Sequence, residues 1–235
     1  MNIETAQMLI STLTLFVAYC IAVTFAGSFR AWVAYKFGDD TAESFGLLTL
    51  NPLAHIDFFG VMLLIFLGFG WGRHVPINPF KIYGPFRTIK IIFAYLSDSL
   101  AYLFMALVSL VFLFYSFGFL GLELAVKMIS QGRLMQAAFA QVFPQASSIL
   151  ISLGLIAIGL ILLTVLLTVL SFVMSCFHLF SNFVLHKFPI YRRYEAILMI
   201  AFPILVIVFF FHPLRVFVIK FLIFFANLLI KAFGA

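Results

Sequence analysis

Four side chains in this sequence are of kinds that bind zinc in proteins, and they lie in two distant stretches of the chain. They are His55, Asp57, His178 and His186. A zinc peptidase also needs a bound water and a base that takes its proton. The helical motif that usually supplies two ligands and the base, H-E-x-x-H, occurs nowhere in the chain. We therefore expect no metal cofactor, and we expect His55 and Asp57 to orient the extended loop that contains them. The alternative is a zinc site formed where His55, Asp57, His178 and His186 converge.

Arg30 and Asp98 are charged residues that border long apolar stretches. Residues 5–29 carry a single charge-free run that ends at Arg30, and Asp98 stands at the start of another apolar run. One interpretation is that Arg30 extends to the membrane surface and anchors its helix there. The other is that Arg30 faces inward and pairs with Asp57 or Asp98, because a buried charge needs a partner. We favour the ion pair, which would hold the helices together without a metal.

The composition predicts where these side chains must be placed. Hydrophobic residues make up 65% of the 235 residues and charged residues 9%, whereas soluble proteins have about half and about a quarter. The mean hydropathy is +1.22. So few charged residues cannot cover the surface of a soluble protein of this size. The chain is therefore expected to be an all-α polytopic membrane protein, which excludes nucleic-acid binding, disorder and a secreted disulfide scaffold.

Apolar runs long enough to cross about 30 Å of hydrocarbon define the expected elements. They predict five or six membrane segments in a single integral membrane domain over residues 1–235, from the runs 5–29, 58–72, 99–122, 149–180, 196–214 and 216–235. Residues 58–72 either span or re-enter. Residues 149–180 form either one overlong helix or a helix broken near Gly154 or Gly159. The only charge near the N-terminus is Glu4, so no cleavable signal is expected.

The net charge of +6 resides mainly in connections between these runs. Basic residues gather in the segments 73–90 and 187–195, as is typical of cytoplasmic loops that face anionic lipid. If residues 58–72 span, both segments share the cytoplasmic side with the N-terminus. If residues 58–72 re-enter, this assignment fails.

Residues 31–80 carry a series of short motifs in a fixed order. They are A-W-V-A-Y, G-D-D-T-A, L-T-L-N-P-L-A-H-I-D and F-G-W-G-R-H-V-P-I-N-P. This series resembles the bacterial site-2 protease family of intramembrane zinc metalloproteases, in the short branch without a PDZ domain. The resemblance implies a site-2-protease-like core over about residues 8–200, with a membrane-embedded extended or re-entrant segment near 45–80. It also implies an edge on which a partner peptide could add as a strand.

The zinc-binding residues of that family are replaced here. Alignment on the A-W-V motif places Ala26 and Arg30 at the two His positions and Gly27 at the Glu position. His186 stands where the family has its third ligand, an Asp. Alanine and glycine offer no lone pair, and arginine is a permanent cation without an acceptor. The resemblance therefore implies the scaffold of the family without its reaction.

These observations favour a catalytically inactive, site-2-protease-like membrane protein that acts by binding. It would be an accessory, assembly or regulatory subunit of a membrane complex, or would hold a single-span client without cutting it. The expected partners are the lipid bilayer and other membrane proteins, in a bacterial inner (plasma) membrane. The alternative is an intramembrane zinc metallopeptidase with relocated ligands. A transporter or channel is less favoured, because paired intramembrane charges are few.

Overall fold

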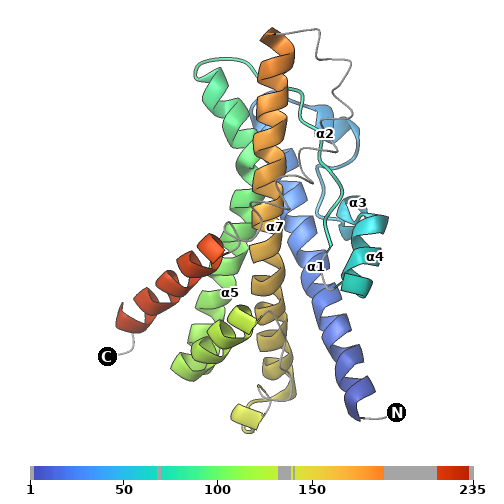
Figure 1. The fold of residues 1–235 in the computed structure, drawn as a ribbon. Coiled ribbons are helices and arrows are strands. Elements are labelled where there is room, and N and C mark those ends of the chain that lie inside the picture. Colours follow the sequence, from blue (N-terminus) through green and yellow to red (C-terminus); the bar gives the residue numbers. More distant parts are fainter. Residues whose placement is uncertain (1–2, 68–69, 132–138, 140, 188–215, 233–235) are drawn as a thin grey trace.

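Three long helices form the body of the protein (Figure 1). The computed structural model describes residues 3–67, 70–131, 139, 141–187 and 216–232. The long helices are α1 (Ile3–Lys36), α5 (Arg87–Gln131) and α7 (Ser148–Lys187). Short helices connect α1 to α5, namely α2 (Thr41–Ser44), α3 (Pro52–His55) and α4 (Phe58–Leu67). A further helix covers residues 216–232.

Three of the described helices are long and apolar enough to cross a membrane. Their candidate spans are Leu9–Lys36, Arg87–Met128 and Ser148–Ser181. An all-helical membrane protein is thus confirmed, whereas five or six spans are not found among the described residues. The predicted segment 196–214 lies outside those residues. The helix 216–232 is described, but it is not one of the candidate spans.

The segment between α3 and residue 73 turns back on itself. Helix α4 has 10 residues, about 15 Å of helix, which is half of what a crossing needs. Ile56 and Gly72 form an antiparallel bridge, and the Arg73 N–H donates to the His55 carbonyl at 2.7 Å. The two ends of the segment therefore lie together. The segment 73–90 was expected on the side of the N-terminus only if residues 58–72 span. Helix α4 is not one of the candidate spans, so the structure does not support that condition.

Backbone contact between the outgoing and returning limbs holds this re-entrant loop closed. A Cβ atom on Gly60 would lie 2.0 Å from the Trp71 carbonyl oxygen, and one on Gly70 would lie 2.0 Å from the Gly60 carbonyl oxygen. Only glycine permits so close an approach. The Tyr19 hydroxyl of α1 donates to the same Trp71 carbonyl at 2.7 Å, which fixes the returning limb to α1.

Helices α5 and α7 depart from the expected runs in different ways. Helix α7 is continuous for 40 residues, so the overlong helix is found and the break at Gly154 is not. A Cβ on Gly154 would lie 2.7 Å from the Phe117 ring, so this glycine permits close packing against α5.

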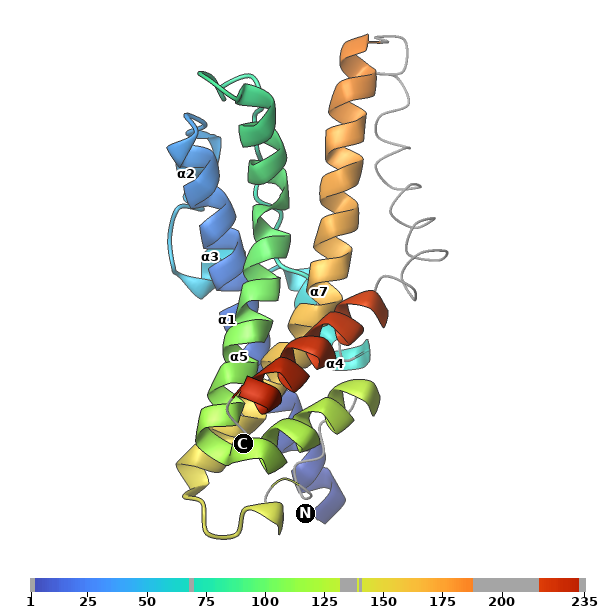
Figure 2. The same cartoon turned by 90° about the vertical axis from the view of Figure 1, so that its left-hand side faces the viewer.

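Helix α5 bends at Gly118 (φ 62°, ψ −158°), inside the predicted run 99–122, and Figure 2 shows the chain turning sharply there. The bend brings the second half of α5 and the helix 216–232 into one core with α7, through Leu122, Ala125, Met128, Ile158, Leu222 and Ala226.

Small residues on α1 let the other two long helices approach it closely. Ala18, Ala22 and Ala26 are fully buried in a cluster that also contains Tyr102 of α5 and Leu167 of α7. Close approach of helix backbones is the usual basis of helix association in membranes, where lipid and side chains are equally apolar. Ala26 is therefore a packing residue.

Candidate functional site

A cavity of about 700 Å³ lies where α1, α5, α7 and the returning limb of the re-entrant loop meet. Most of its lining is apolar, and Val23, Tyr102, Leu167 and Met174 are examples. Its polar lining comes from every one of these elements and comprises Arg30, Asp57, Gly72, Arg73, His74, Asp98, Ser171 and His178. Residues that the sequence placed in separate motifs therefore share one space.

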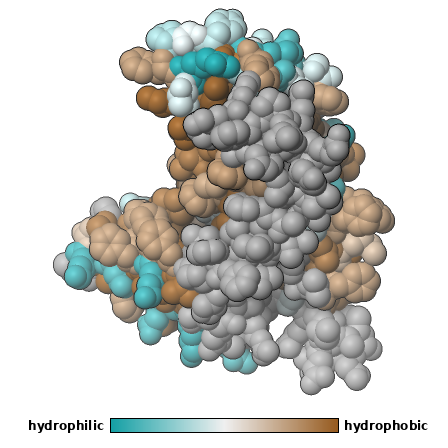
Figure 3. Space-filling model, turned by 45° about the horizontal axis from the view of Figure 1, so that its top comes forward, coloured by the Kyte–Doolittle hydropathy of each residue, from teal (hydrophilic) through white to brown (hydrophobic). Residues whose placement is uncertain are grey.

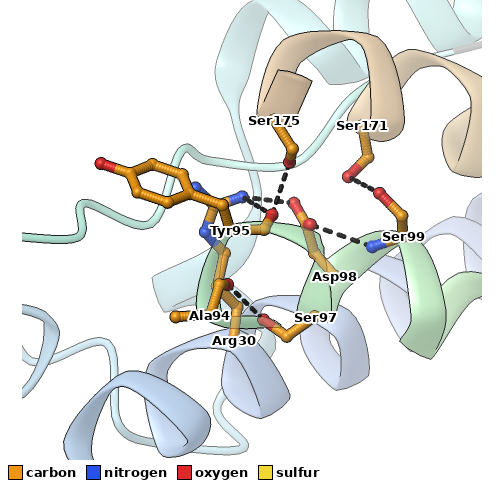
Figure 4. Close-up of polar contacts among 8 residues, drawn as sticks. All are labelled: Arg30, Ala94, Tyr95, Ser97, Asp98, Ser99, Ser171 and Ser175. Carbon is orange, nitrogen blue, oxygen red and sulfur yellow. Dashed lines mark hydrogen bonds and ion pairs between the residues drawn. The ribbon is translucent and has the colours of Figure 1, made fainter. Parts of the chain in front are cut away.

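Arg30 is buried in the wall of this cavity and pairs with Asp98 (Figure 4). The Arg30 side chain is 5% exposed and its Nη1 donates to Asp98 Oδ2 at 2.7 Å. Its guanidinium also lies 5.7 Å from the centre of the Tyr95 ring. Within the described part of the chain, the Nε and Nη2 atoms of Arg30 have no hydrogen-bond partner. The arginine thus holds α1 to α5 with one nitrogen and leaves its other edge unused.

Asp98 is bonded within its own helix, and hydrogen bonds on either side of it join α5 to α7 (Figure 4). The Ser99 backbone N–H donates to Asp98 Oδ1 at 2.9 Å, so both carboxylate oxygens are engaged. The Ser99 and Ser171 hydroxyls lie 2.8 Å apart and join the two helices. Ser175 of α7 donates to the Tyr95 carbonyl one turn away. Asp98 is therefore held by Arg30 of α1 and by its own helix, while the serines of α7 fix the neighbouring residues of α5.

His55 is packed against Gly27 of α1. It is fully buried, and its Nε2 lies 2.8 Å from the Thr49 carbonyl and 3.1 Å from the Ser28 hydroxyl. Since a carbonyl only accepts, we assign the ring proton to Nε2, which leaves a lone pair on Nδ1. A Cβ on Gly27 would lie 2.4 Å from that Nδ1. The imidazole thus fills the space into which any side chain at residue 27 would project.

Asp57 begins helix α4 and does not pair with Arg30. Its Oδ1 accepts from the Gly60 N–H at 2.8 Å, the bond expected of an N-cap carboxylate. Of the two carboxylates proposed as partners for Arg30, Asp98 is the one that the structure brings to it. The role of Asp57 is to start the re-entrant helix.

This assignment predicts different effects for two substitutions at Asp57. Asp57→Ala should lower the free energy of unfolding by about 1 kcal/mol, because the Gly60 N–H loses its acceptor. Asp57→Asn should be close to wild type, because asparagine caps equally well. Equilibrium unfolding of the purified protein measures both. If Asp57 acted mainly as an ion-pair partner, the asparagine variant would be destabilised as much as the alanine variant.

His178 meets a histidine that the sequence motifs did not single out. The rings of His74 and His178 lie 5.1 Å apart, and the Tyr95 ring lies 6.2 Å from that of His178. His74 lines the cavity; the surrounding protein desolvates it, and with the charge of Arg30 this lowers the pKa of His74 to about 4. His74 is therefore neutral at pH 7. The sequence signal that could have pointed to His74 is its position directly after F-G-W-G-R, in one of the motifs that resemble the family.

The described residues do not fit a zinc site. No group of three or more His, Cys, Asp or Glu side chains that could hold a metal comes together among them. His55 bonds to Thr49 and Ser28, and Asp57 caps α4. His186 lies in α7, but its side chain is outside the described part of the structure. Of the four candidate ligands, His55, Asp57 and His178 have described side chains, and these three do not come together as a metal site.

Comparison with known proteins agrees with the motif resemblance. The chain is 38% identical over 127 residues to the "Putative zinc metalloprotease YwhC" of Bacillus subtilis (strain 168). The match covers 54% of this chain and 52% of that protein, so the chain spans about half the length of this curated relative. No family model and no solved structure matches the chain. The identity supports a site-2-protease-like relationship.

Proposed function

We propose that this chain is a catalytically inactive, site-2-protease-like protein that binds a membrane-embedded segment of another protein without cutting it. It would serve as an accessory or regulatory subunit of a membrane complex in a bacterial inner membrane. The observation that carries this proposal is the Arg30–Asp98 pair, which is buried at the cavity wall. A permanent cation at a former ligand position repels a metal ion instead of binding it.

The carboxylates of the cavity also argue against hydrolysis. A general base must be free to take a proton from water. Asp98 accepts from Arg30 and from Ser99, and Asp57 accepts from Gly60, so both carboxylates are engaged. Favourable partners of this kind stabilise the charged carboxylate and weaken it as a base. Gly27 offers no base at all.

The size and lining of the cavity support a binding role. A volume of about 700 Å³ lies within the range of about 300–1,000 Å³ that is usual for ligand sites. Its apolar lining suits side chains from a membrane segment. The cavity lies among the three candidate spans, so such a segment would enter it laterally from the bilayer. A client would insert one or two large side chains there, because a whole helix is about 10 Å wide.

Site-specific photocrosslinking in membranes tests this function. A photoreactive amino acid at Leu170, in the cavity wall, should attach to an uncut membrane polypeptide of one discrete mass. The matched control is Phe172, which is 42% exposed on the same helix and should give no such product. Lipid adducts alone at both positions, or a cleaved polypeptide at Leu170, would overturn the proposal.

Zinc analysis separates this function from the metallopeptidase alternative. We expect the detergent-purified protein to contain no stoichiometric zinc by elemental analysis, and the His55→Ala/His186→Ala variant to be no different. About one zinc per chain that is lost in the double variant would instead favour the alternative site of His55, Asp57, His178 and His186. Peptidase assays would then be required.

A further inference from the structure

The helix 216–232 presents three different faces around its axis. At about 100° per residue, all of its exposed residues fall within one arc of about 140°. The opposite side is packed against the protein, with Leu222, Ala226 and Leu229 buried. The exposed arc is itself divided, because its polar residues occupy one edge and its apolar residues the remainder. In order around the arc, the exposed residues are Asn227, Lys220, Lys231, Phe224, Phe217, Leu228, Phe221 and Ala232.

The two exposed faces differ sharply in character. Phe217 and Phe224 are 69% and 65% exposed, so the apolar face carries large rings that no other part of the chain covers among the described residues. Lys220 and Lys231 lie on the polar edge, about three turns and 16 Å apart along the helix. At the left of Figure 3, where this helix lies in Figure 1, hydrophobic side chains lie above a lower edge of hydrophilic ones. A helix with an apolar face beside a lysine-bearing face is typical of the membrane interface.

The direction of this helix agrees with an interfacial position. Figures 1 and 2 show the helix 216–232 and the second half of α5 running obliquely across the long helices instead of along them. In a helix that crossed the bilayer, the row of Lys220, Asn227 and Lys231 would run through hydrocarbon, where polar and charged side chains are costly. In a helix that lies along the membrane plane, the three side chains can reach the headgroups together.

The packing partners of the helix give its depth. The candidate span of α7 has its midpoint close to Leu163, which shares a cluster with Val23 at the midpoint of the α1 span. Ile158 lies about 10 Å from that midpoint, toward the beginning of α7. It is therefore about 5 Å inside the edge of the hydrocarbon layer. Leu222 and Ala226 share a core with Ile158. The apolar face of an interfacial helix lies at such a depth, about 5–10 Å below the headgroup boundary.

The charges of this layer indicate which headgroups it suits. The second half of α5 carries Glu123 and Lys127, whose formal charges cancel. Lys220 and Lys231 form no ion pair within the part of the chain that the structure describes. The described part of the layer thus has an excess positive charge on one exposed edge. Exposed lysines near a membrane surface attract anionic lipids.

We propose that the helix 216–232 lies in the membrane interface and binds anionic lipid headgroups through Lys220 and Lys231, with Phe217, Phe221 and Phe224 among the acyl chains. No residue of this helix lines the cavity, so this surface is separate from the proposed client site. The lipid site goes beyond the proposed function and does not depend on it.

Lipid capture beside the two lysines tests the partner. The purified chain, with a photoreactive amino acid at Asn227, is placed in vesicles of equal parts phosphatidylglycerol and phosphatidylcholine with identical acyl chains. Mass spectrometry should show an excess of phosphatidylglycerol adducts of about threefold or more. Lys220→Gln/Lys231→Gln should bring the ratio to about one. The control Lys36→Gln/Lys90→Gln removes the same charge from α1 and the start of α5 and should keep the excess. Equal adducts with both lysines present, or an excess that survives their removal, would overturn the proposal.

Two neighbouring cysteines test the orientation without altering a charge. In a background with serine in place of Cys20 and Cys176, Asn227→Cys lies on the polar edge and Leu228→Cys on the apolar face. In nanodiscs open to water on both sides, a membrane-impermeant maleimide should label Asn227→Cys about tenfold faster, because the apolar face lies about 5–10 Å below the headgroups. Adjacent residues of a crossing helix differ in depth by only about 1.5 Å. Equal labelling of the two variants would therefore exclude the in-plane position.

Discussion

Arg30→Met is expected to lower the free energy of unfolding by about 3–5 kcal/mol, one of the two largest effects that the structure predicts. Methionine fills a similar volume, so the loss comes from charge and not from packing. The substitution leaves Asp98, whose side chain is 17% exposed, without the cation that lies 2.7 Å from it. A carboxylate stranded among membrane helices is costly. Unfolding in mixed micelles with increasing denaturing detergent measures the change.

Two further variants show whether the ion pair is the cause. Arg30→Met/Asp98→Leu removes both charges and should be within about 1 kcal/mol of wild type, because a buried pair can often be exchanged for apolar residues. Arg73→Met removes an exposed cation from the same cavity and should have little effect. If Arg30→Met loses less than about 1 kcal/mol, Arg30 reaches the membrane surface and the pair contributes little.

The choice of partner for Arg30 shows how far sequence reasoning reaches. That Arg30 needs a carboxylate follows from its position beside a long uncharged run. Asp57 and Asp98 were equal candidates, since both border apolar segments. The structure separates them through local geometry, because Asp57 is adjacent to the free N–H groups at the start of α4. A helix start of that kind satisfies a carboxylate without a cation.

The re-entrant loop could not be distinguished from a span by sequence. Residues 58–72 are apolar and nearly long enough to cross, and hydropathy does not record where a chain turns back. The return depends on contacts between residues about ten positions apart, Gly60 with Gly70 and Trp71. Glycines in the two long helices α5 and α7 also differ in role. Gly118 bends α5, whereas Gly154 in an unbroken α7 makes room for Phe117.

Gly27 and His55 show that a side chain cannot be introduced at residue 27 without a second change. A side chain at residue 27 would meet the His55 ring, which is fixed by Thr49 and Ser28. The glycine at residue 27 and the inward packing of His55 therefore depend on each other. The motif resemblance implies that residue 27 lacks the base of the family. The structure shows that the space beside this glycine is filled by the His55 ring.

Gly60→Ala is expected to be the other large effect, with a loss of about 3 kcal/mol or more. The new methyl group would lie 2.0 Å from the Trp71 carbonyl oxygen, and backbone atoms cannot move aside as a flexible side chain can. Separation of the two limbs would also pull Trp71 from the Tyr19 hydroxyl, which donates to it at 2.7 Å. The returning limb forms part of the cavity wall, so photocrosslinking at Leu170 should weaken in parallel.

A double variant identifies this contact as the origin of the loss. Gly70→Ala breaks the same approach from the other limb, at 2.0 Å from the Gly60 carbonyl oxygen. Once either substitution has separated the limbs, the second has little left to disrupt. Gly60→Ala/Gly70→Ala should therefore cost much less than the sum of the single losses. Phe59→Ala, on the same helix with a side chain that is 69% exposed, should change stability little. Additive losses, or a Gly60→Ala protein as stable as wild type, would mean that the limbs do not meet and that residues 58–72 extend across the membrane.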